Sequence, residues 1–303
     1  MKKSAVVALA GRPSVGKSTL INQLCGAKVA IVSPSPQTTR SAIRGILTKP
    51  EGQLIFIDTP GRHKSEKKFN KKLMDIADRA LEDADIILYL LDLSRSPGIE
   101  EEAVAERLST LQERCIAVIN KMDMEGYDSL KHHAFLNSFL PEIPEARRFE
   151  ISSLKKEGTG ALLDCLYEMA PEGEPLYPDE YYTDQDMNFR ISEIIREKAI
   201  NRLRQELPHS IYVEVADLEF REAPNSEDGE KKRLWVRAFI ITERESQKGM
   251  IVGKGGEKIK AIGQAARKEL NSIFDWKVEL DLRVKTGKDW RQNDRLLKKI
   301  TGS

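Results

Sequence analysis

The 303-residue sequence has few cysteines and no long apolar run, and each shortage excludes a class of protein. Cys25, Cys115 and Cys165 are odd in number, widely spaced and form no Cys-x-x-Cys pair, so neither a disulfide framework nor a zinc site is indicated. We expect them to be small apolar core residues. No stretch of about 18 apolar residues occurs, which argues against a membrane-spanning helix. The N-terminal apolar run is too short for a signal peptide, and a cytoplasmic protein is expected.

The net charge is also small, at +1, but the charged residues are unevenly distributed along the chain. Residues 185–303 hold 25 Lys and Arg against 20 Asp and Glu, whereas residues 1–184 hold 24 against 28. A polyanion would meet the second part more readily. So small an excess is also ordinary for a solvated surface, so a motif is needed to decide its meaning.

Apolar strands alternate with amphipathic helices from residue 4 to about residue 170. Near-continuous apolar strands between helices predict a mostly parallel sheet with helices on both faces, an α/β domain over residues 1–172. Residues 173–186 then concentrate Pro, Gly, acids and Tyr without a period, which is typical of a linker. The expected strands cover residues 5–11, 53–61, 85–94, 115–123 and 147–153.

Residues 187–303 follow a different order, which predicts a smaller α+β domain. A glycine-rich turn lies between two of its expected helices. The expected elements are a helix over 187–207 that ends at Pro208, strands over 210–220 and 233–242, a short helix from about Glu243, a helix over 257–274, a strand over 276–285 and a last basic helix.

Residues 11–18 read GRPSVGKS, a GxxxxGK[ST] motif between an apolar strand and a helix. In this context the glycines let the backbone wrap phosphates, Lys17 neutralises their charge, and the Ser18 hydroxyl can bind Mg²⁺. The predicted phosphate-binding residues are Gly11, Arg12, Pro13, Ser14, Val15, Gly16, Lys17, Ser18 and Thr19.

The sequence DTPG ends the next strongly apolar strand and places Asp58 where it can hold the metal directly or through water. A polar segment before it contains Thr38 and Thr39. Either threonine could close over Mg²⁺ when the γ-phosphate is present, and Thr39 is preferred. The predicted metal ligands are Ser18, Thr39 and Asp58, and the second switch comprises Asp58, Thr59, Pro60, Gly61 and Arg62.

The sequence NKMD, residues 120–123, ends a later strand at the sheet edge where ligands of open α/β sheets bind. Asp123 can accept hydrogen bonds from two N–H donors of guanine, a pair that adenine lacks. Asn120 is expected to brace neighbouring loops, and the stem of Lys121 to lie along the base. Ser152 and Ser153, at the end of the last strand, could offer backbone N–H groups to the guanine oxygen.

Four motifs in this order, GRPSVGKS, DTPG, NKMD and ISS, resemble the GTP-binding domain of translation-factor-related GTPases. Within them, SPQTTR and DTPGRHK are similar to the Era family, the bacterial GTPases of small-ribosomal-subunit assembly. The resemblance covers the whole chain, because Era-family members also carry one C-terminal KH domain that binds RNA. It implies a Mg²⁺-dependent GTPase that binds the 3′ end of 16S rRNA and acts in 30S maturation. Because no glutamine follows DTPG, a slow intrinsic rate is expected. Peripheral association with the inner face of the membrane is a further implication, and a monomer is expected.

Three positions depart from the family pattern. Ser14 stands where Asn is usual, and Ser153 stands where Ala is usual. Arg62 follows DTPG where an apolar residue or Gln is common, which leaves the positioning of water open. It is either an internal arginine finger or an exposed side chain. An RNA-binding scaffold in which the nucleotide is only structural is therefore the alternative function.

The turn at residues 251–262, IVGKGGEKIKAI, lacks the spacing of the first motif and resembles the GxxG loop of a type II KH domain. Its glycines let the backbone approach a single-stranded sugar-phosphate chain, while its lysines supply charge. The apolar residues can form a floor for bases and can equally be core. The predicted RNA-binding residues are Ile251, Val252, Gly253, Lys254, Gly255, Gly256, Lys258, Ile259 and Ile262. Arg291, Arg295, Lys298 and Lys299 of the last helix either contact RNA or form a solvated face.

Overall fold

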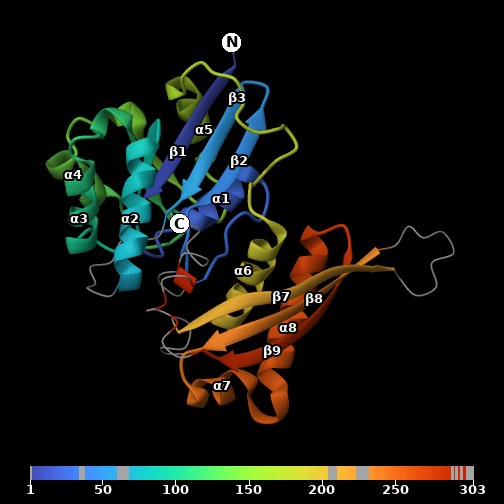
Figure 1. Ribbon diagram of the computed structural model, residues 1–303. Coiled ribbons are helices and arrows are strands. Elements are labelled where there is room, and N and C mark those ends of the chain that lie inside the picture. The colour runs from blue at the N-terminus through green and yellow to red at the C-terminus, as the bar shows by residue number, and fades with distance from the viewer. Residues whose placement is uncertain are drawn as a thin grey trace. The chain divides into compact units, whose positions relative to one another are not determined.

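The computed structural model describes residues 2–33, 38–59, 68–203, 210–222, 232–287, 290, 293, 296 and 297 (Figure 1). The chain divides into two compact units, and the division falls between Asp184 and Gln185. The first unit carries the GxxxxGK[ST] motif, and the second carries the GxxG loop.

The first unit is built on a six-stranded sheet in the order β2-β3-β1-β4-β5-β6 (Figure 1). β2 runs antiparallel to β3, and all the other neighbouring strands are parallel. Because the parallel strands share one direction, the motifs that follow them meet at one edge of the sheet. The strands are β1 (Lys3–Ala10), β2 (Ile43–Lys49), β3 (Gly52–Asp58), β4 (Ile86–Asp92), β5 (Cys115–Asn120) and β6 (Arg148–Ile151).

Helices cover both faces of this sheet, which confirms the predicted α/β class (Figure 1). One face packs against α2, α3 and α4 in a core whose centre is β4 and β5. Every residue of β3 and β4 is buried, as their near-continuous apolar sequences predict. The helices are α1 (Lys17–Cys25), α2 (Lys68–Asp83), α3 (Ile99–Leu108), α4 (Leu130–Phe139) and α5 (Thr159–Met169).

The strand β2 was not expected from the sequence. Its apolar pattern is interrupted by Arg44 and Gly45, which weakens the strand signal. Gly45 is nevertheless required, because a Cβ there would lie 2.7 Å from Ile21 Cγ2 and 2.8 Å from Cys25 Sγ of α1. Close packing of α1 on the sheet therefore explains this residue. Cys115 is buried as predicted, whereas Cys25 and Cys165 are half-buried.

Residues 173–184 make up most of the linker that the sequence predicts, and they are fastened to β2, the edge strand of the first unit. Ile46 N donates to Tyr182 O at 3.0 Å, and Thr183 Oγ1 donates to Arg44 O at 2.8 Å. The Arg44 guanidinium also pairs with the Asp184 carboxylate at 3.0 Å. The connection is thus fastened to β2 up to the last residue of the first unit.

The second unit is a three-stranded sheet, in the order β7-β8-β9, packed against helices. β7 and β8 are antiparallel with an irregularity between Val215 and Asp217, and β8 and β9 are parallel. No helix in the described ranges is both long and apolar enough to cross a membrane. The elements are α6 (Met187–Ile200), β7 (Ile211–Glu222), β8 (Lys232–Thr242), α7 (Glu245–Val252), α8 (Glu257–Ile273) and β9 (Lys277–Thr286).

The first helix of this unit is shorter than predicted. α6 ends at Ile200, not near Pro208. Beyond it, Arg202 N donates to Ala199 O, three residues back, and Leu203 N is shared between Ala199 O and Ile200 O, as is common at helix ends. The predicted last helix falls mostly outside the described residues, although Trp290 is buried and its indole N–H donates to Ser210 O at 3.2 Å.

Candidate functional site

The GxxxxGK[ST] loop connects β1 to α1, and its conformation requires both glycines. Gly11 has φ 146° and Gly16 has φ 107°, values that side chains rarely allow. A Cβ on Gly11 would lie 2.7 Å from Leu90 O, and one on Gly16 would lie 2.3 Å from Asn120 Nδ2. Gly16 directly precedes α1, whose free N–H groups and dipole favour an anion. The loop is therefore a phosphate-binding loop in conformation as well as in sequence.

Lys17 is buried within this loop, where its ammonium donates to Gly11 O at 2.9 Å and to Arg12 O at 3.0 Å. Burial lowers the pKa of Lys17 to about 8; the Asp58 carboxylate opposes this shift, and the Arg12 guanidinium adds to it. A phosphate beside Lys17 would raise this pKa again and keep the ammonium charged above pH 8.

The three residues predicted to bind Mg²⁺ come together. Asp58 Oδ2 accepts hydrogen bonds from Ser18 Oγ at 2.5 Å and from Thr39 Oγ1 at 3.0 Å, and the two hydroxyls lie 3.3 Å apart. The other carboxylate oxygen, Oδ1, is buried without a hydrogen-bond partner among the described residues. Burial raises the pKa of Asp58, while Lys17 and the two hydroxyls oppose that rise.

This oxygen set fits Mg²⁺. Adjacent ligands of an octahedral Mg²⁺ lie about 2.9 Å apart, which is close to the spacing of the three oxygens. Within the described ranges no group of three His, Cys, Asp or Glu residues assembles, so a cation here would be held by one carboxylate, two hydroxyls and the phosphates. Of the two switch threonines, the structure places Thr39 in this group.

The rest of the DTPG motif is only partly described. The Thr59 side chain is buried and its hydroxyl donates to Leu9 O at 2.7 Å, so that it fastens the end of β3 to β1. Pro60, Gly61 and Arg62 lie outside the described residues. The two roles suggested for Arg62 therefore remain predictions.

Asn120 braces two loops, as the sequence suggests. Its Nδ2 donates to Val15 O of the phosphate loop at 2.9 Å. Its Oδ1 accepts from both the backbone N and the Oγ of Ser153, at 3.0 and 2.9 Å. The family's usual Ala at position 153 would lack the second of these bonds, so Ser153 strengthens the brace.

Asp123 is held beside the same loop, since Ser152 Oγ donates to its Oδ1 at 2.5 Å. The amides of Ser152 and Ser153, which are predicted to serve guanine, both have partners within the protein. Ser152 N donates to Glu157 O at 3.1 Å, and Ser153 N donates to Asn120. The tight turn that follows β6 uses both donors, so a guanine oxygen would have to share or displace these bonds.

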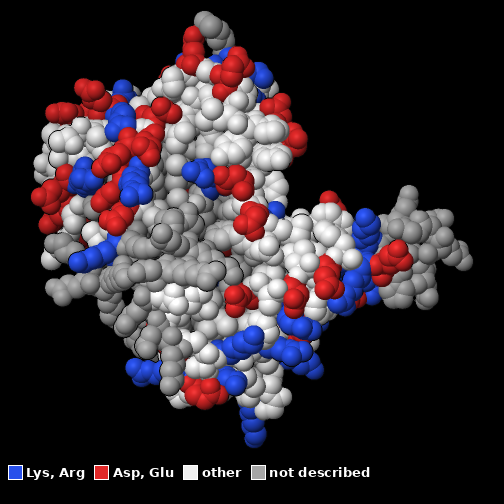
Figure 2. Space-filling model, in the orientation of Figure 1, with Lys and Arg blue, Asp and Glu red and all other residues white. Residues whose placement is uncertain are grey.

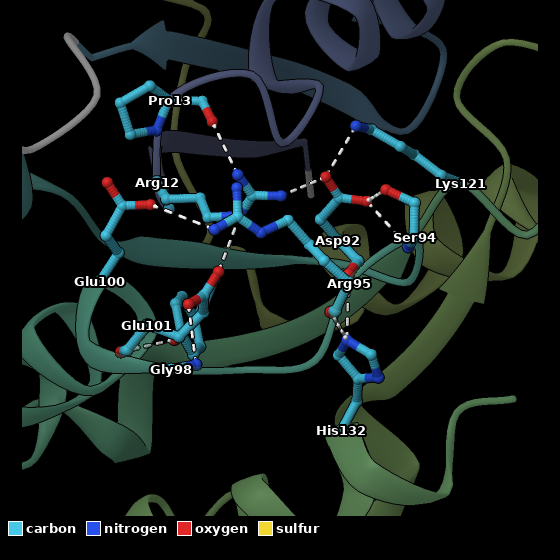
Figure 3. A network of polar contacts seen from close by, with 12 residues as sticks. Arg12, Pro13, Asp92, Ser94, Arg95, Gly98, Glu100, Glu101, Lys121 and His132 are labelled. Atoms are coloured by element: carbon cyan, nitrogen blue, oxygen red, sulfur yellow. Dashed lines mark hydrogen bonds and ion pairs between the residues drawn. The ribbon is translucent and has the colours of Figure 1, made fainter. Parts of the chain in front are cut away.

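Asp92, at the end of β4, is a site residue that the sequence analysis missed (Figure 3). Its Oδ2 accepts from Arg12 Nη2 and, at 2.7 Å, from Lys121 Nζ. Its Oδ1 accepts from the N and Oγ of Ser94, at 3.0 and 2.6 Å. Burial disfavours the charged carboxylate, but the bonds from Lys121 and Ser94 outweigh it, and the pKa of Asp92 lies below its ordinary value. An acid at the carboxyl end of a central strand was the available signal.

Two of the predicted site residues have unusual backbones. Ser14 has φ 62° and Lys121 has φ 75°, both in the left-handed region. Asn adopts this region more readily than Ser, which explains the family's usual residue at position 14. Such conformations gather at binding sites because the surrounding structure holds them.

The GxxG loop joins α7 to α8 in the second unit. Gly253, Gly255 and Gly256 all have positive φ, at 75°, 61° and 81°. No atom lies within 4 Å of a Cβ placed on Gly255 or Gly256, so the backbone is open to a ligand. Lys254 and Lys258 are exposed, and Figure 2 shows Lys and Arg side chains gathered around α7 and along β9.

The apolar floor expected beside this loop is only half present. Ile251 and Ile262 are fully buried members of the core, because α7 and α8 pack their apolar faces on the sheet. Val252 and Ile259 are half-buried and remain accessible. Arg291, Arg295, Lys298 and Lys299 lie outside the described residues.

The first unit thus combines a phosphate loop, a hydroxyl and carboxylate set for Mg²⁺, and a braced Asn-Lys-x-Asp motif, and the second unit has a GxxG loop between helices. Together they define a P-loop GTPase joined to a KH domain. A family model described as "50S ribosome-binding GTPase" matches residues 6–121, and one described as "KH domain" matches residues 206–291. The chain belongs to the Era family of GTPases, as the relatives below show.

Relatives match over nearly the whole chain. GTPase Era of Treponema denticola is 51% identical over 298 residues, which cover 98% of this chain and 99% of the relative. GTPase Era of Borreliella burgdorferi is 45% identical over 300 residues, with coverage of 98% and 99%.

Two solved structures are also similar. A single-site variant of Aquifex aeolicus Era bound to GDP and AlF₄⁻ is 35% identical, with a TM-score of 0.90 and coverage of 99% of both chains. Era in complex with MgGDPNP and nucleotides 1506–1542 of 16S ribosomal RNA is 35% identical, with a TM-score of 0.92 and coverage of 100% of this chain and 99% of that chain.

Proposed function

We propose that the protein binds GTP with Mg²⁺, hydrolyses it to GDP and phosphate, and binds the 3′ end of 16S rRNA during maturation of the 30S subunit. The observation that carries the proposal is the convergence of Ser18, Thr39 and Asp58 beside the phosphate loop. The GxxG loop on the same chain, and the RNA bound by a similar Era structure, support the RNA partner.

The residues of the site divide the work of hydrolysis. Lys17 and the N–H groups at the start of α1 stabilise charge on the β- and γ-phosphates. Ser18, Thr39 and Asp58 would hold Mg²⁺, which would supply positive charge beside the phosphates. Asn120, Lys121 and Asp123 hold the guanine. Because no glutamine follows DTPG to orient water, we expect a slow intrinsic rate.

We further propose that GTP favours RNA binding. Thr39 lies beside Asp58, four residues before β2 begins, and β2 holds the connection to the second unit at Arg44 and Ile46. A ligand that orders this switch can therefore bias the connection. Tenfold tighter RNA binding needs about 1.4 kcal/mol of coupling, a modest amount.

Phosphate release tests the function directly. The full-length protein is given saturating GTP and Mg²⁺, with and without an RNA of the sequence 1506–1542. Release of GDP and phosphate well above the rate of a Lys17→Ala variant supports a GTPase. RNA binding without turnover would favour a scaffold with structural nucleotide.

The remaining proposals concern place and assembly. We expect a monomer that acts in the cytoplasm, where its RNA partner is. Association with the inner face of the membrane is tested by flotation with anionic vesicles, and failure to float would remove that part of the proposal. Light scattering of the nucleotide-bound protein measures its mass, and a dimer would contradict the monomer.

A further inference from the structure

Two cations from different nucleotide-binding motifs share one carboxylate oxygen in the first unit. Arg12 belongs to the phosphate loop and Lys121 belongs to the Asn-Lys-x-Asp motif, and both donate to Oδ2 of Asp92 (Figure 3). We propose that Asp92 is a positioning residue for the nucleotide base: it holds the Lys121 ammonium, and thereby the stem expected to lie along the guanine, at a fixed place relative to the phosphate loop. This role of Asp92 rests on the guanine nucleotide site proposed above.

The two cations depend on Asp92 to different degrees. Arg12 has other partners, because its Nε lies 2.7 Å from Glu101 Oε1 and its Nη1 donates to Pro13 O at 3.4 Å. In the described part of the chain, Asp92 is the partner of the Lys121 ammonium, at 2.7 Å. Loss of the Asp92 charge would therefore release Lys121 while Arg12 stayed anchored to Glu101. The base side of the site is the side that Asp92 controls.

The carboxylate is itself held rigidly. Asp92 ends the fully buried strand β4 and lies in register with Asn120 at the end of β5. Ser94 fixes the rotation of the carboxylate through two hydrogen bonds to Oδ1. The His132 ring Nε2 lies 3.0 Å from Asp92 O and 3.2 Å from Arg95 O, which ties α4 to the turn that follows β4. A charged group held from several sides can set the position of a long, otherwise flexible side chain.

The backbone of Lys121 adds a second reason for such a support. With φ 75°, Lys121 is one of three non-glycine residues in the described ranges that have positive φ. A left-handed lysine costs free energy and persists only where its surroundings hold it. The ion pair with Asp92 and the brace through Asn120 provide that support from both sides.

A double-mutant cycle on the full-length protein tests this role. The variants are Asp92→Asn, Lys121→Met, which keeps the stem without the charge, and the combination of both. The affinity for GDP is measured for each. We expect Asp92→Asn to weaken GDP binding by about tenfold, and the double variant to bind no more weakly than Lys121→Met alone, because the two residues act as one unit.

Glu101→Gln is the matched comparison. It removes the other charge next to Arg12, while its amide oxygen can still accept from Gly98 N, as Glu101 Oε2 does at 3.0 Å. Glu101 does not contact Lys121. The fold losses of GDP affinity in Glu101→Gln and Lys121→Met should therefore multiply when the two changes are combined. Multiplied losses for Asp92→Asn and Lys121→Met would overturn the proposal.

Inorganic pyrophosphate separates a role at the base from a general loss of structure, because it competes for the phosphate loop but has no base. We expect the affinity of Asp92→Asn for pyrophosphate to stay within about twofold of the wild-type value, because pyrophosphate has no base for the Lys121 stem to contact. Equal losses for pyrophosphate and GDP would show that Asp92 acts only on the phosphate loop or on folding, against the proposal.

Two further outcomes are decisive. If Asp92→Asn does not fold, Ser94→Ala is the substitute, because it frees the rotation of the same carboxylate. We expect Ser94→Ala to weaken GDP binding about threefold. When it is added to Lys121→Met, it should cause no further loss of GDP affinity. If the wild-type protein itself fails to bind GDP, the proposed nucleotide site fails. Wild-type binding combined with multiplied losses overturns only the role of Asp92.

Discussion

Asn120 Nδ2 donates a hydrogen bond of 2.9 Å to the carbonyl oxygen of Val15, a residue 105 positions earlier in the chain. The same amide group accepts two bonds from Ser153 through its oxygen. One buried side chain therefore connects the phosphate loop, the Asn-Lys-x-Asp motif and the turn after β6. The base and phosphate parts of the nucleotide site are held as one piece by this residue.

We predict that Asn120→Ala destabilises the first unit and accelerates GDP release. The change leaves Val15 O and Ser153 N without their partner in a buried place, at a cost of about 2–4 kcal/mol. Thermal unfolding and the GDP dissociation rate measure the two effects. Asn137→Ala is the control, because Asn137 bonds Arg148 at the exposed surface and should change neither quantity. An unchanged dissociation rate in Asn120→Ala would contradict the brace.

GDP binding should take up a proton as the pH rises above 8. Burial lowers the pKa of Lys17 to about 8 in the free protein, and a neighbouring polyphosphate raises it. Below pH 8 Lys17 is already charged and contributes no pH dependence. Above pH 8 the bound protein holds more protons than the free protein, so affinity falls by up to about tenfold per pH unit.

Calorimetry between pH 7 and 9, in two buffers of different ionisation enthalpy, measures this proton uptake. Lys17→Met removes the titrating group, so its weaker binding should lack the uptake that belongs to Lys17. Any pH dependence that arises from guanine itself persists in this control and can be subtracted. Equal uptake in both proteins would assign the effect to another group.

Thr39→Ala should weaken Mg²⁺-dependent binding of a non-hydrolysable GTP analogue, whereas Thr38→Ala should not. Thr39 Oγ1 lies 3.0 Å from Asp58 Oδ2 in the oxygen set, so its loss removes an interaction with a charged centre, worth about 1.5 kcal/mol or roughly tenfold. Titration of the analogue at several Mg²⁺ concentrations measures the change. A larger effect of Thr38→Ala would move the switch threonine to position 38.

Much of the architecture follows from local sequence. The strands β3, β4 and β5 are continuous apolar runs, and the motifs at their ends reach one sheet edge because the strands are parallel. Ser18 and Asp58 meet for this reason, whereas Thr39 reaches them because β2 runs antiparallel to β3 and begins at Ile43, opposite Asp58. The GxxG loop was also identifiable, since its glycines separate two helical patterns.

The remaining features depend on partners distant in sequence. Gly45 in β2 is explained only by its close contact with α1. Asp92 can be recognised as a site residue only once Arg12 and Lys121 are seen to contact it. Periodicity likewise cannot tell a groove floor from core. Ile251 proved to be core and Ile259 accessible, because the packing of α7 and α8 on the sheet decides which is covered.

Gly255→Asp should strongly weaken RNA binding with little loss of stability. Gly255 has φ 61°, which Asp tolerates better than most residues, and a Cβ there has no neighbour within 4 Å. The new carboxylate would repel the RNA backbone at the point of closest approach. Gly160→Asp makes the same change at an open glycine of the first unit. Filter binding of the 3′-end RNA should fall at least about tenfold for Gly255→Asp alone. Equal binding by both variants would place the RNA elsewhere.

The connection fastened to β2 gives the last prediction, which concerns communication between nucleotide and RNA. Thr183→Val combined with Asp184→Ala removes the hydroxyl bond to Arg44 O and the exposed ion pair with Arg44, but keeps the backbone bond at Tyr182. The exposed hydrogen bond from the Tyr177 hydroxyl to Asp184, at 3.1 Å, is lost as well. Stability should change by no more than about 1–2 kcal/mol, because all three interactions lie at the surface.

The ratio of RNA affinities in the GTP-analogue and GDP states should nevertheless fall toward one, because the switch segment leads into β2 and this strand would no longer hold the last residues before the second unit. RNA binding measured in both nucleotide states gives the ratio. Asp179→Ala, an exposed change in the same connection, is the control and should leave the ratio at its wild-type value. If the double variant also keeps the wild-type ratio, the nucleotide state must reach the RNA by a route other than β2 and its fastened connection.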